Sequence, residues 1–445
     1  MNKLIPTKFG FLPEDWRIKS LAGCTTKIQD GTHFSPRTTE GPFLYVTSKN
    51  IRPGRLDLST AGCISEEEHR SIYSRCDVKP GDVLLTKDGA NTGNACLNTE
   101  DQQFSLLSSV AVLRADHAEN VGGFILQYLM SPSGQKRLKD LMSGNAIPRL
   151  TLQKIKAFEL PVPPRPQQCR IAEILSTVDE VIEQTEALIG KYQQIKVGLM
   201  HDLFTRGVTP DGQLRPTHAE APHLYQTSPL GWIPKKWKIK PLLHFVPIAV
   251  YGISVSMDDD PSGVPVMRMN NIFQGRINVS DIKFSETSDA RSLTLRYDDV
   301  LFNRTNSLEH VGKTAIWRGE LPAASFASYL VRLDVDTQMM RPLFLVYWLN
   351  LPITQLIIRQ FATPGVHQVN INPTNLRRIN CAAPIDLSEQ DRITSRIEAL
   401  DVTRRSHDEH LAKLRQQKQG LMHDLLTGRV RVPIQESDRS SPPQS

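Results

Sequence analysis

The sequence predicts an α+β fold built from two repeated halves that are joined by two long helices, which pair antiparallel like a coiled coil. Three observations predict it. One order of motifs occurs twice along the chain, each copy contains short strand-like runs, and each copy ends in a long helix without proline. We therefore expect the two halves to be related by a pseudo-twofold axis.

Composition supports a globular protein with more than one domain. The chain has 445 residues, whereas one domain usually has about 100–200. Hydrophobic residues make up 39% and charged residues 22%, which is typical of folded chains. The net charge of +6 is compatible with a polyanionic partner without requiring one. No apolar run reaches the roughly 18 residues of a membrane span, and no secretory signal opens the chain, so we expect a cytoplasmic protein.

The cysteines are scattered, without the paired spacing of a zinc site or of a disulfide framework. We therefore expect free and mostly buried thiols. The six cysteines are Cys24, Cys63, Cys76, Cys96, Cys169 and Cys381.

The repeat has matching strings at both ends of each copy. Residues 10–19, GFLPEDWRIK, return at 231–240 as GWIPKKWKIK. Residues 198–205, GLMHDLFT, return at 420–427 as GLMHDLLT. The offset between the copies stays nearly constant, so the chain is a tandem duplication.

Each copy has the same internal order. Runs of β-branched and aromatic residues between Gly, Pro and Asn are expected as short strands, and a short helix follows them. A cluster of prolines then precedes the long helix of the first copy. The ranges are 43–47, 82–86 and 109–113 for the strands, 122–130 and 343–349 for the short helices, and 161–166 for the prolines.

The first long helix is predicted from Gln168 to Phe204 because its apolar residues follow heptad spacing. A second helix is predicted from Gln390 to Leu426, where the second seam row is polar, so we expect it to pack against the first. The expected packing residues are Ile171, Val178, Thr185, Tyr192 and Leu199 in the first helix, with Ile174, Val181, Leu188 and Ile195 as a second row, and Ile393, Leu400, His407, Leu414 and Leu421 in the second helix.

Thr185 and His407 are the polar members in the middle of these two rows. If the helices run antiparallel about a pseudo-twofold axis, Thr185 and His407 should face each other. A structural role for His407 is favoured over a pH switch.

These patterns together resemble the specificity subunit of type I restriction–modification systems. The resemblance rests on the repeated opening Gly-x-[Ile/Leu]-Pro-x-x-Trp, on Gln-x-x-Ile at the start of each long helix, and on the closing GLMHDL strings. It covers roughly residues 8–430. The loop after the first strand departs from the family's usual Gly-Thr-Pro form: it is Asp30-Gly31-Thr32 in the first copy and Tyr251-Gly252-Ile253 in the second.

The resemblance implies that each strand-rich region is a target-recognition domain that reads one half of an asymmetric, two-part DNA sequence. The helices would fix the gap between the half-sites and bind two methyltransferase subunits, and motor–nuclease subunits would join for cleavage. The implied parts are recognition domains at 1–160 and 231–384, spacer helices at 161–208 and 385–428, a linker at 209–230 and a disordered tail at 429–445.

Side chains that read DNA need donors and acceptors on loops, and phosphate contacts need cations or hydroxyl groups. For each candidate a solvated surface role is the alternative; Asn50 and Asn271 could equally be turn residues, and Gly31, Gly93, Gly252 and Gly312 are expected as turn formers. The candidates are His33, Arg37, Lys49, Asn50, Arg52, Lys87, Asn91, Thr92 and Arg149, with the segment 143–149, in the first copy, and Arg268, Asn270, Asn271, Arg304, Asn306, Lys313 and His367 in the second.

The sequence lacks the motifs of an enzyme. No Asn/Asp-Pro-Pro-aromatic motif of an amino-methyltransferase and no phosphate-binding loop occurs; residues 372–375, NPTN, are the nearest string. The strings 281–283 and 407–410 are weak candidates for a nuclease motif and a metal site. We therefore expect a non-catalytic subunit that binds double-stranded DNA, without cofactor, metal or membrane. A stand-alone DNA-binding or scaffolding protein, or the recognition part of a fused methyltransferase–nuclease, are the alternatives.

Overall fold

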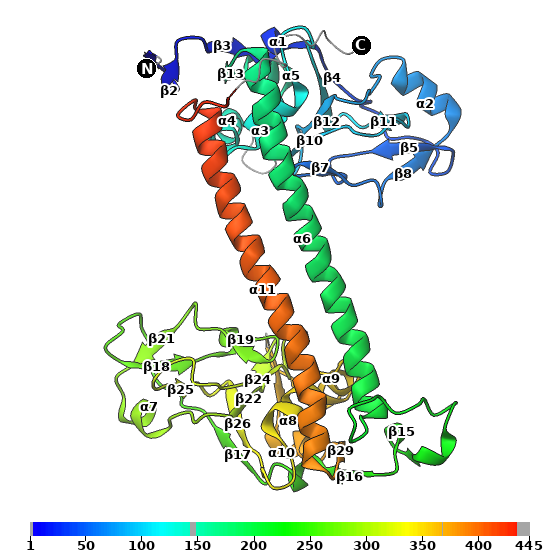
Figure 1. The fold of residues 1–445 in the computed structure, drawn as a ribbon, viewed down its shortest axis with the longest axis vertical. Helices are drawn as coiled ribbons and strands as arrows, with labels where there is room; N and C mark the ends of the chain where they lie inside the picture. Colours follow the sequence, from blue (N-terminus) through cyan, green and yellow to red (C-terminus); the bar gives the residue numbers. More distant parts are fainter. Residues whose placement is uncertain (1–2, 143–147, 367, 434–445) are drawn as a thin grey trace. The chain divides into compact units, whose positions relative to one another are not determined.

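The computed structural model describes residues 3–142, 148–366 and 368–433 (Figure 1). The chain forms two compact units. The first unit consists of Met1–Leu188 and His407–Ser445, and the second of Ile189–Ser406. Each unit therefore contains one strand-rich region together with part of each long helix.

The first unit is organised around two small sheets. One has four antiparallel strands in the order β10 (Ala95–Leu97), β9 (Val83–Thr86), β12 (Val110–Ala115) and β4 (Thr25–Asp30). The other has the order β11 (Phe104–Leu106), β5 (Phe43–Val46) and β8 (Gly62–Ile64), and β11 runs parallel to β5. The strands predicted at 43–47, 82–86 and 109–113 correspond to β5, β9 and β12 and are confirmed.

Helices cover these sheets and complete the core of the first unit. The helices α3 (Gly122–Met130) and α4 (Pro132–Leu141) follow β12, and α3 matches its predicted bounds. Ser131 separates them because its hydroxyl accepts a hydrogen bond from the Gly134 amide at 3.0 Å, which caps α4 in front of a proline. The remaining elements are β1 (Leu4–Thr7), β2 (Gly10–Pro13), β3 (Arg17–Ser20), α1 (Leu21–Cys24), β6 (Ile51–Arg52), β7 (Arg55–Leu56), α2 (Glu66–Tyr73), α5 (Leu152–Ala157) and β13 (Glu159–Val162).

The second unit repeats this order. Its largest sheet has the order β17 (Ile248–Tyr251), β26 (Leu330–Asp334), β22 (Val300–Asn303), β24 (Thr314–Ile316), β20 (Arg276–Ile277) and β19 (Ile272–Phe273). The other strands are β14 (Tyr225–Ser228), β15 (Gly231–Pro234), β16 (Trp237–Pro241), β18 (Val264–Met267), β21 (Lys283–Ser285), β23 (Thr305–Asn306), β25 (Ser325–Phe326), β27 (Ala362–Pro364), β28 (Val369–Ile371) and β29 (Asn380–Pro384).

The helices α8 (Pro342–Leu349) and α9 (Pro352–Arg359) take the place of α3 and α4 in the second unit, beside the short helices α7 (Ser288–Ser292) and α10 (Pro373–Leu376). The helix predicted at 343–349 is thus confirmed. In the described part of the chain no single helix is long and apolar enough to cross a membrane; α8 and α9 would pass only as a pair, which is bent by 72°. The side chains of α8 lie in the core of the second unit.

The two predicted long helices are α6 (Arg165–Arg206) and α11 (Leu387–Leu426) (Figure 1). Ion pairs show that they run antiparallel in the first unit, because Asp179 contacts Lys418 and Glu186 contacts Arg415 at 2.7 Å. In the second unit Lys196 binds the buried Asp401 carboxylate at 2.7 Å. The coiled-coil-like pairing of the prediction is confirmed.

The glutamine of the Gln-x-x-Ile motif attaches each long helix to its unit. The Gln168 side chain accepts from the Val121 amide at 3.0 Å and donates to the Pro163 carbonyl at 2.9 Å. Gln390 makes the same pair of bonds, from the Arg341 amide at 2.8 Å and to the Pro384 carbonyl at 3.0 Å. Both amides are fully satisfied at a buried position, which explains why the motif recurs.

The predicted second apolar row of α6 is wrong in its middle part. Val181, Leu188 and Ile195 are 37%, 36% and 45% exposed, so they face solvent in this structure. In the first row Ile171 is buried, and Thr185 is buried with its hydroxyl donating to the Val181 carbonyl at 2.7 Å. The expectation that Thr185 faces His407 stays a prediction.

All six cysteines are free, as predicted, and four are buried. Burial raises the pKa of Cys24 and Cys76 to about 11 and that of Cys96 to about 12.

The first residues of the predicted disordered tail pack on the first unit, because Val432 is buried and Arg431 pairs with Asp15. Residues 434–445 of that tail lie outside the described residues.

Candidate nucleic-acid interface

Several loops of the first unit meet around Lys87, the residue that follows β9. Its side chain is only 3% exposed, and its ammonium group lies 3.3 Å from an Asp30 oxygen and 2.9 Å from an Asp88 oxygen. Asp30 is the last residue of β4. Two carboxylates therefore compensate a buried cation at the ends of β4 and β9, the strands on either side of β12.

The two carboxylates that contact Lys87 also contact two exposed side chains. The Arg149 Nε lies 3.0 Å from the Asp88 carboxylate, and the Arg149 side chain is 61% exposed. His33 Nε2 lies 3.5 Å from Asp30, and the His33 side chain is 55% exposed. The structure thus brings together the predicted residues His33, Lys87 and Arg149. We call Asp30, Lys87, Asp88 and Arg149 the first cluster.

The second unit has different side chains at the corresponding backbone positions. Arg304 follows β22, and its guanidinium lies 5.2 Å from the ring centre of Tyr251, which is a cation–π contact. The Thr305 hydroxyl donates to Asn370 Oδ1 at 2.5 Å. We call Tyr251, Arg304, Thr305 and Asn370 the second cluster.

The backbone hydrogen bonds of the two clusters correspond one to one. The Lys87 amide donates to the Ser109 carbonyl at 2.8 Å, as the Arg304 amide does to Tyr329 at 3.0 Å. The Lys87 carbonyl accepts from Leu150 at 2.8 Å, as the Arg304 carbonyl does from Ile371 at 2.8 Å. Lys87 and Arg304 are therefore equivalent positions of the duplication.

The glycine beside each cluster allows a close approach of two backbone segments. A Cβ atom on Gly31 would lie 1.9 Å from the Leu106 carbonyl oxygen, and one on Gly252 would lie 2.3 Å from that of Ala327. Neither glycine has a positive φ angle, so the expectation that they are turn formers is wrong for these two. Gly93 and Gly312, with φ angles of 98° and 87°, do occupy the left-handed region.

The structure shows Asn50 and Asn271 in the turn role that was the alternative to a DNA contact. They are 2% and 1% exposed. Asn50 Oδ1 accepts from the Thr47 amide at 2.9 Å, and Asn271 Oδ1 accepts from the Arg268 amide at 2.8 Å. Each Nδ2 donates to a backbone carbonyl seven residues further on, that of Asp57 or Asn278. Their side-chain amides bind the protein's own backbone, as turn residues do.

The other candidates differ in how far they are engaged. Arg37, Lys49, Arg52 and Asn270 are exposed, and Arg52 lies 3.6 Å from Asp57. Partners within the same unit hold the others: Asn91 donates to Ser48 at 3.3 Å, Thr92 to Gly89 at 2.6 Å, Arg268 pairs with Asp281 at 2.9 Å, Asn306 accepts from the Ser307 amide at 2.8 Å, and Lys313 contacts His310 at 2.6 Å. His367 and residues 143–147 lie outside the described residues.

Sequence reasoning missed Asp30, Tyr251 and Asn370. It searched the loops for cations and amides, whereas Asp30 and Tyr251 end strands and contact the neighbouring cation. One signal could have found two of them: Asp30 and Tyr251 occupy the same position of the repeat and differ completely in chemistry.

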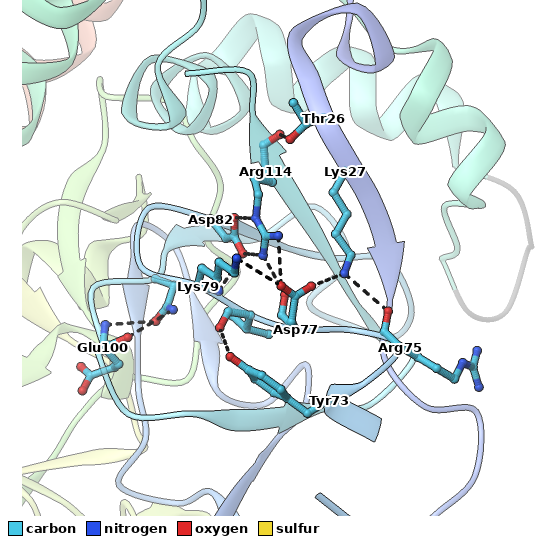
Figure 2. A network of polar contacts seen from close by, with 11 residues as sticks. Thr26, Lys27, Tyr73, Arg75, Asp77, Lys79, Asp82, Glu100 and Arg114 are labelled. Carbon is cyan, nitrogen blue, oxygen red and sulfur yellow. Dashed lines mark hydrogen bonds and ion pairs between the residues drawn. The ribbon is translucent and has the colours of Figure 1, made fainter. Parts of the chain in front are cut away.

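An ionic network fixes the opposite end of the same strands in the first unit. Figure 2 shows Arg114 of β12 between Asp82 and Asp77, and Lys27 of β4 reaching Asp77 as well. Arg114 binds both oxygens of the buried Asp82, at 2.9 and 2.8 Å. Asp82 precedes β9 and Lys87 follows it, so this network sets the register of the strands that present the first cluster.

Replacing Arg114 with alanine is expected to destabilise the first unit by about 2–3 kcal/mol, because Asp82 would stay buried without its partner. The control is Arg415→Ala, which breaks an exposed pair and should cost at most about 1 kcal/mol. Urea unfolding of the full chain measures both. Equal effects of the two changes would contradict the prediction.

The same variant should unfold more readily in acid. Burial is the largest influence on the pKa of Asp77 and would raise it, but Lys27 and Arg114 together hold the pKa below its ordinary value. A lowered pKa gives stability that is present above the pKa of the unfolded chain and is lost as the pH falls through that of the folded chain. Without Arg114 this loss should begin at a higher pH.

The weak motif at 281–283 has ordinary ionic partners. Asp281 pairs with Arg268 at 2.9 Å, and Lys283 pairs with Asp259 at 2.5 Å. Within the described residues no group of three or more His, Cys, Asp or Glu side chains could hold a metal ion.

Comparison with known proteins gives one consistent result. Residues 13–196 match the family model described as the type I restriction modification DNA specificity domain. The MjaVIII type I restriction enzyme specificity subunit of Methanocaldococcus jannaschii is 23% identical over 436 residues, covering 95% of this chain and 94% of that protein. The StySPI specificity subunit of Salmonella potsdam is 20% identical, covering 88% of this chain and 83% of that protein.

Solved structures share the fold. The crystal structure of a type I restriction–modification S subunit from M. genitalium superposes with a TM-score of 0.58 at 15% identity, covering 92% of this chain and 96% of that one. A chain from a structure of type I restriction–modification complex assembly gives 0.52 at 17% identity, covering 94% and 99%. Over most of its length the chain is thus similar in sequence and in fold to specificity subunits of type I restriction–modification systems, and its residues 13–196 match the DNA specificity domain of that family.

Proposed function

We propose that this chain recognises an asymmetric DNA sequence of two separated parts, with each unit reading one half-site. The observation that carries the proposal is the pair of clusters. Their backbone hydrogen bonds correspond, but an acidic and basic set stands in the first unit where an aromatic, basic and amide set stands in the second. Two recognition sites that share a backbone arrangement but differ in their side chains are suited to reading two different half-sites.

Exposed cations in the first unit support the DNA contact. Arg37 and Lys49 are exposed on loops, and Arg52 keeps 48% of its side chain exposed. Such cations contact phosphates and orient the protein on the duplex, while the clusters supply contacts to base edges. In this division Arg37, Lys49 and Arg52 give affinity, and the clusters give sequence preference.

The long helices are proposed to bind two methyltransferase subunits and to fix the gap between the half-sites. The exposed row of Val181, Leu188 and Ile195 supports this, because apolar side chains at heptad spacing on a solvent-facing helix are suited to a partner helix. Motor–nuclease subunits would join that assembly for cleavage. The corresponding parts are recognition domains at 1–160 and 231–384, spacer helices at 161–208 and 385–428, a linker at 209–230 and a tail at 429–445.

The test is co-expression with the methyltransferase subunit encoded with this chain, followed by sequencing that maps methylated adenines. We expect one two-part asymmetric motif that disappears when this chain is deleted. Exchanging residues 10–160 for those of a related specificity subunit should change one half of the motif and leave the other half intact. If no complex forms and no two-part motif depends on the chain, it is a stand-alone DNA-binding or scaffolding protein.

A further inference from the structure

Arg149 is held in a way that leaves its outer donors to a ligand. In the contact with Asp88, Nε lies 3.0 Å from Oδ1, and among the described residues neither Nη group makes a hydrogen bond. The side chain is 61% exposed. An arginine whose Nη groups are presented as a fork matches the O6 and N7 acceptors of guanine in the major groove, which is the commonest specific contact of proteins with DNA.

The residues behind Arg149 are hard to explain by stability alone. Lys87 is 3% exposed and faces two carboxylates, Asp30 at 3.3 Å and Asp88 at 2.9 Å. Removing three charged groups from water is costly, and apolar residues of similar size often stabilise a fold as well or better. The exposed pair of Arg149 with Asp88 adds little stability either. The arrangement instead fixes the orientation of Asp88, and through it that of Arg149.

The second unit provides an internal comparison. Its frame is the same, but Asn370 stands where Arg149 stands, and Thr305 stands where Asp88 stands. Asn is the side chain that pairs with adenine through N6 and N7. At this equivalent backbone position the first unit thus presents an arginine and the second unit presents an asparagine.

We propose that Arg149 selects a guanine in the half-site read by the first unit, and that Asp88, Lys87 and Asp30 position it for this contact. The proposal rests on the proposed function, because it needs a DNA half-site. Arg149 touches the base, whereas the other three residues act through it.

The test uses the complex of this chain with its methyltransferase subunit and the target found by methylation mapping. A set of duplexes, each with one base pair of that target replaced, is assayed for methylation by the wild type, Arg149→Lys and Asp88→Asn. Arg149→Lys keeps the charge but loses the two-donor fork. The matched control is Arg70→Lys, on an exposed arginine of α2 that pairs with Glu66.

We expect the wild type to discriminate about 10-fold to 100-fold against replacement of one G·C pair in the first half-site. Arg149→Lys should lose this preference at that single position and keep all others, including the whole second half-site. Asp88→Asn should lose part of the preference at the same position. Arg70→Lys should behave as the wild type does.

Three results would overturn the proposal: a first half-site without any required G·C pair, an unchanged profile for Arg149→Lys, or a loss that is equal on every duplex. The last would mean a phosphate contact. If Asp88→Asn does not fold, the exposed Arg149→Lys carries the test alone. Failure of the proposed function looks different, because then the wild type itself has no two-part target.

Discussion

Replacing Glu389 with alanine should destabilise the second unit by about 3–5 kcal/mol, because it leaves a buried guanidinium without its partner. Glu389 binds Arg215 through both oxygens, at 2.5 and 2.8 Å, and the two side chains are 5% and 9% exposed. The same carboxylate accepts from the Trp237 indole at 3.0 Å and from the Val208 amide at 3.1 Å. The guanidinium, the indole and the amide all lose this acceptor.

The measurement is urea unfolding combined with hydrogen exchange resolved along the chain, so that loss of protection is assigned to the second unit. Two controls separate charge from packing. The double variant Glu389→Met with Arg215→Met removes both charges and should recover most of the loss. Glu389→Gln keeps an acceptor for Trp237 and should cost less than alanine. A loss below about 1 kcal/mol for Glu389→Ala would contradict the prediction.

The first unit shows why this site could be found only in part from the sequence. Gln167 is the repeat equivalent of Glu389, and its side chain accepts from the Trp16 indole at 3.1 Å. The repeated tryptophans and helix starts were visible in the sequence. Arg215 was not a candidate, because it lies in the stretch read as a linker and its contact with Glu389 joins residues far apart in the chain.

The same limit applies to the recognition clusters. Heptad spacing and alternating runs are local patterns, so they predicted α6, α11 and the strands β5, β9 and β12 correctly. The first cluster joins Asp30, Lys87 and Arg149, which only the tertiary fold brings together. Local spacing also placed Val181, Leu188 and Ile195 in the seam, although they are exposed. Heptad spacing alone cannot distinguish a row that packs on a neighbouring helix from a row that faces solvent.

Replacing Gly31 with alanine should cost about 3 kcal/mol or more and should impair the first half-site selectively. The added Cβ would lie 1.9 Å from the Leu106 carbonyl oxygen and 2.7 Å from the Leu106 Cβ, so two backbone segments must separate. Those segments are joined by the Thr32 amide, which donates to the Leu106 carbonyl at 2.8 Å. Separating them displaces Asp30, the residue next to Gly31 that holds Lys87.

Gly62→Ala is the matched control, because a Cβ at Gly62 in the same unit meets nothing within 4 Å; its stability should stay within about 0.5 kcal/mol of the wild type. Gly252→Ala is the counterpart in the second unit, with a Cβ 2.3 Å from the Ala327 carbonyl oxygen. Methylation mapping of the two glycine variants should then show reciprocal defects, the first half of the motif for Gly31→Ala and the second half for Gly252→Ala. Defects that affect both halves equally would mean that the glycines support the fold as a whole and that the clusters do not read separate half-sites.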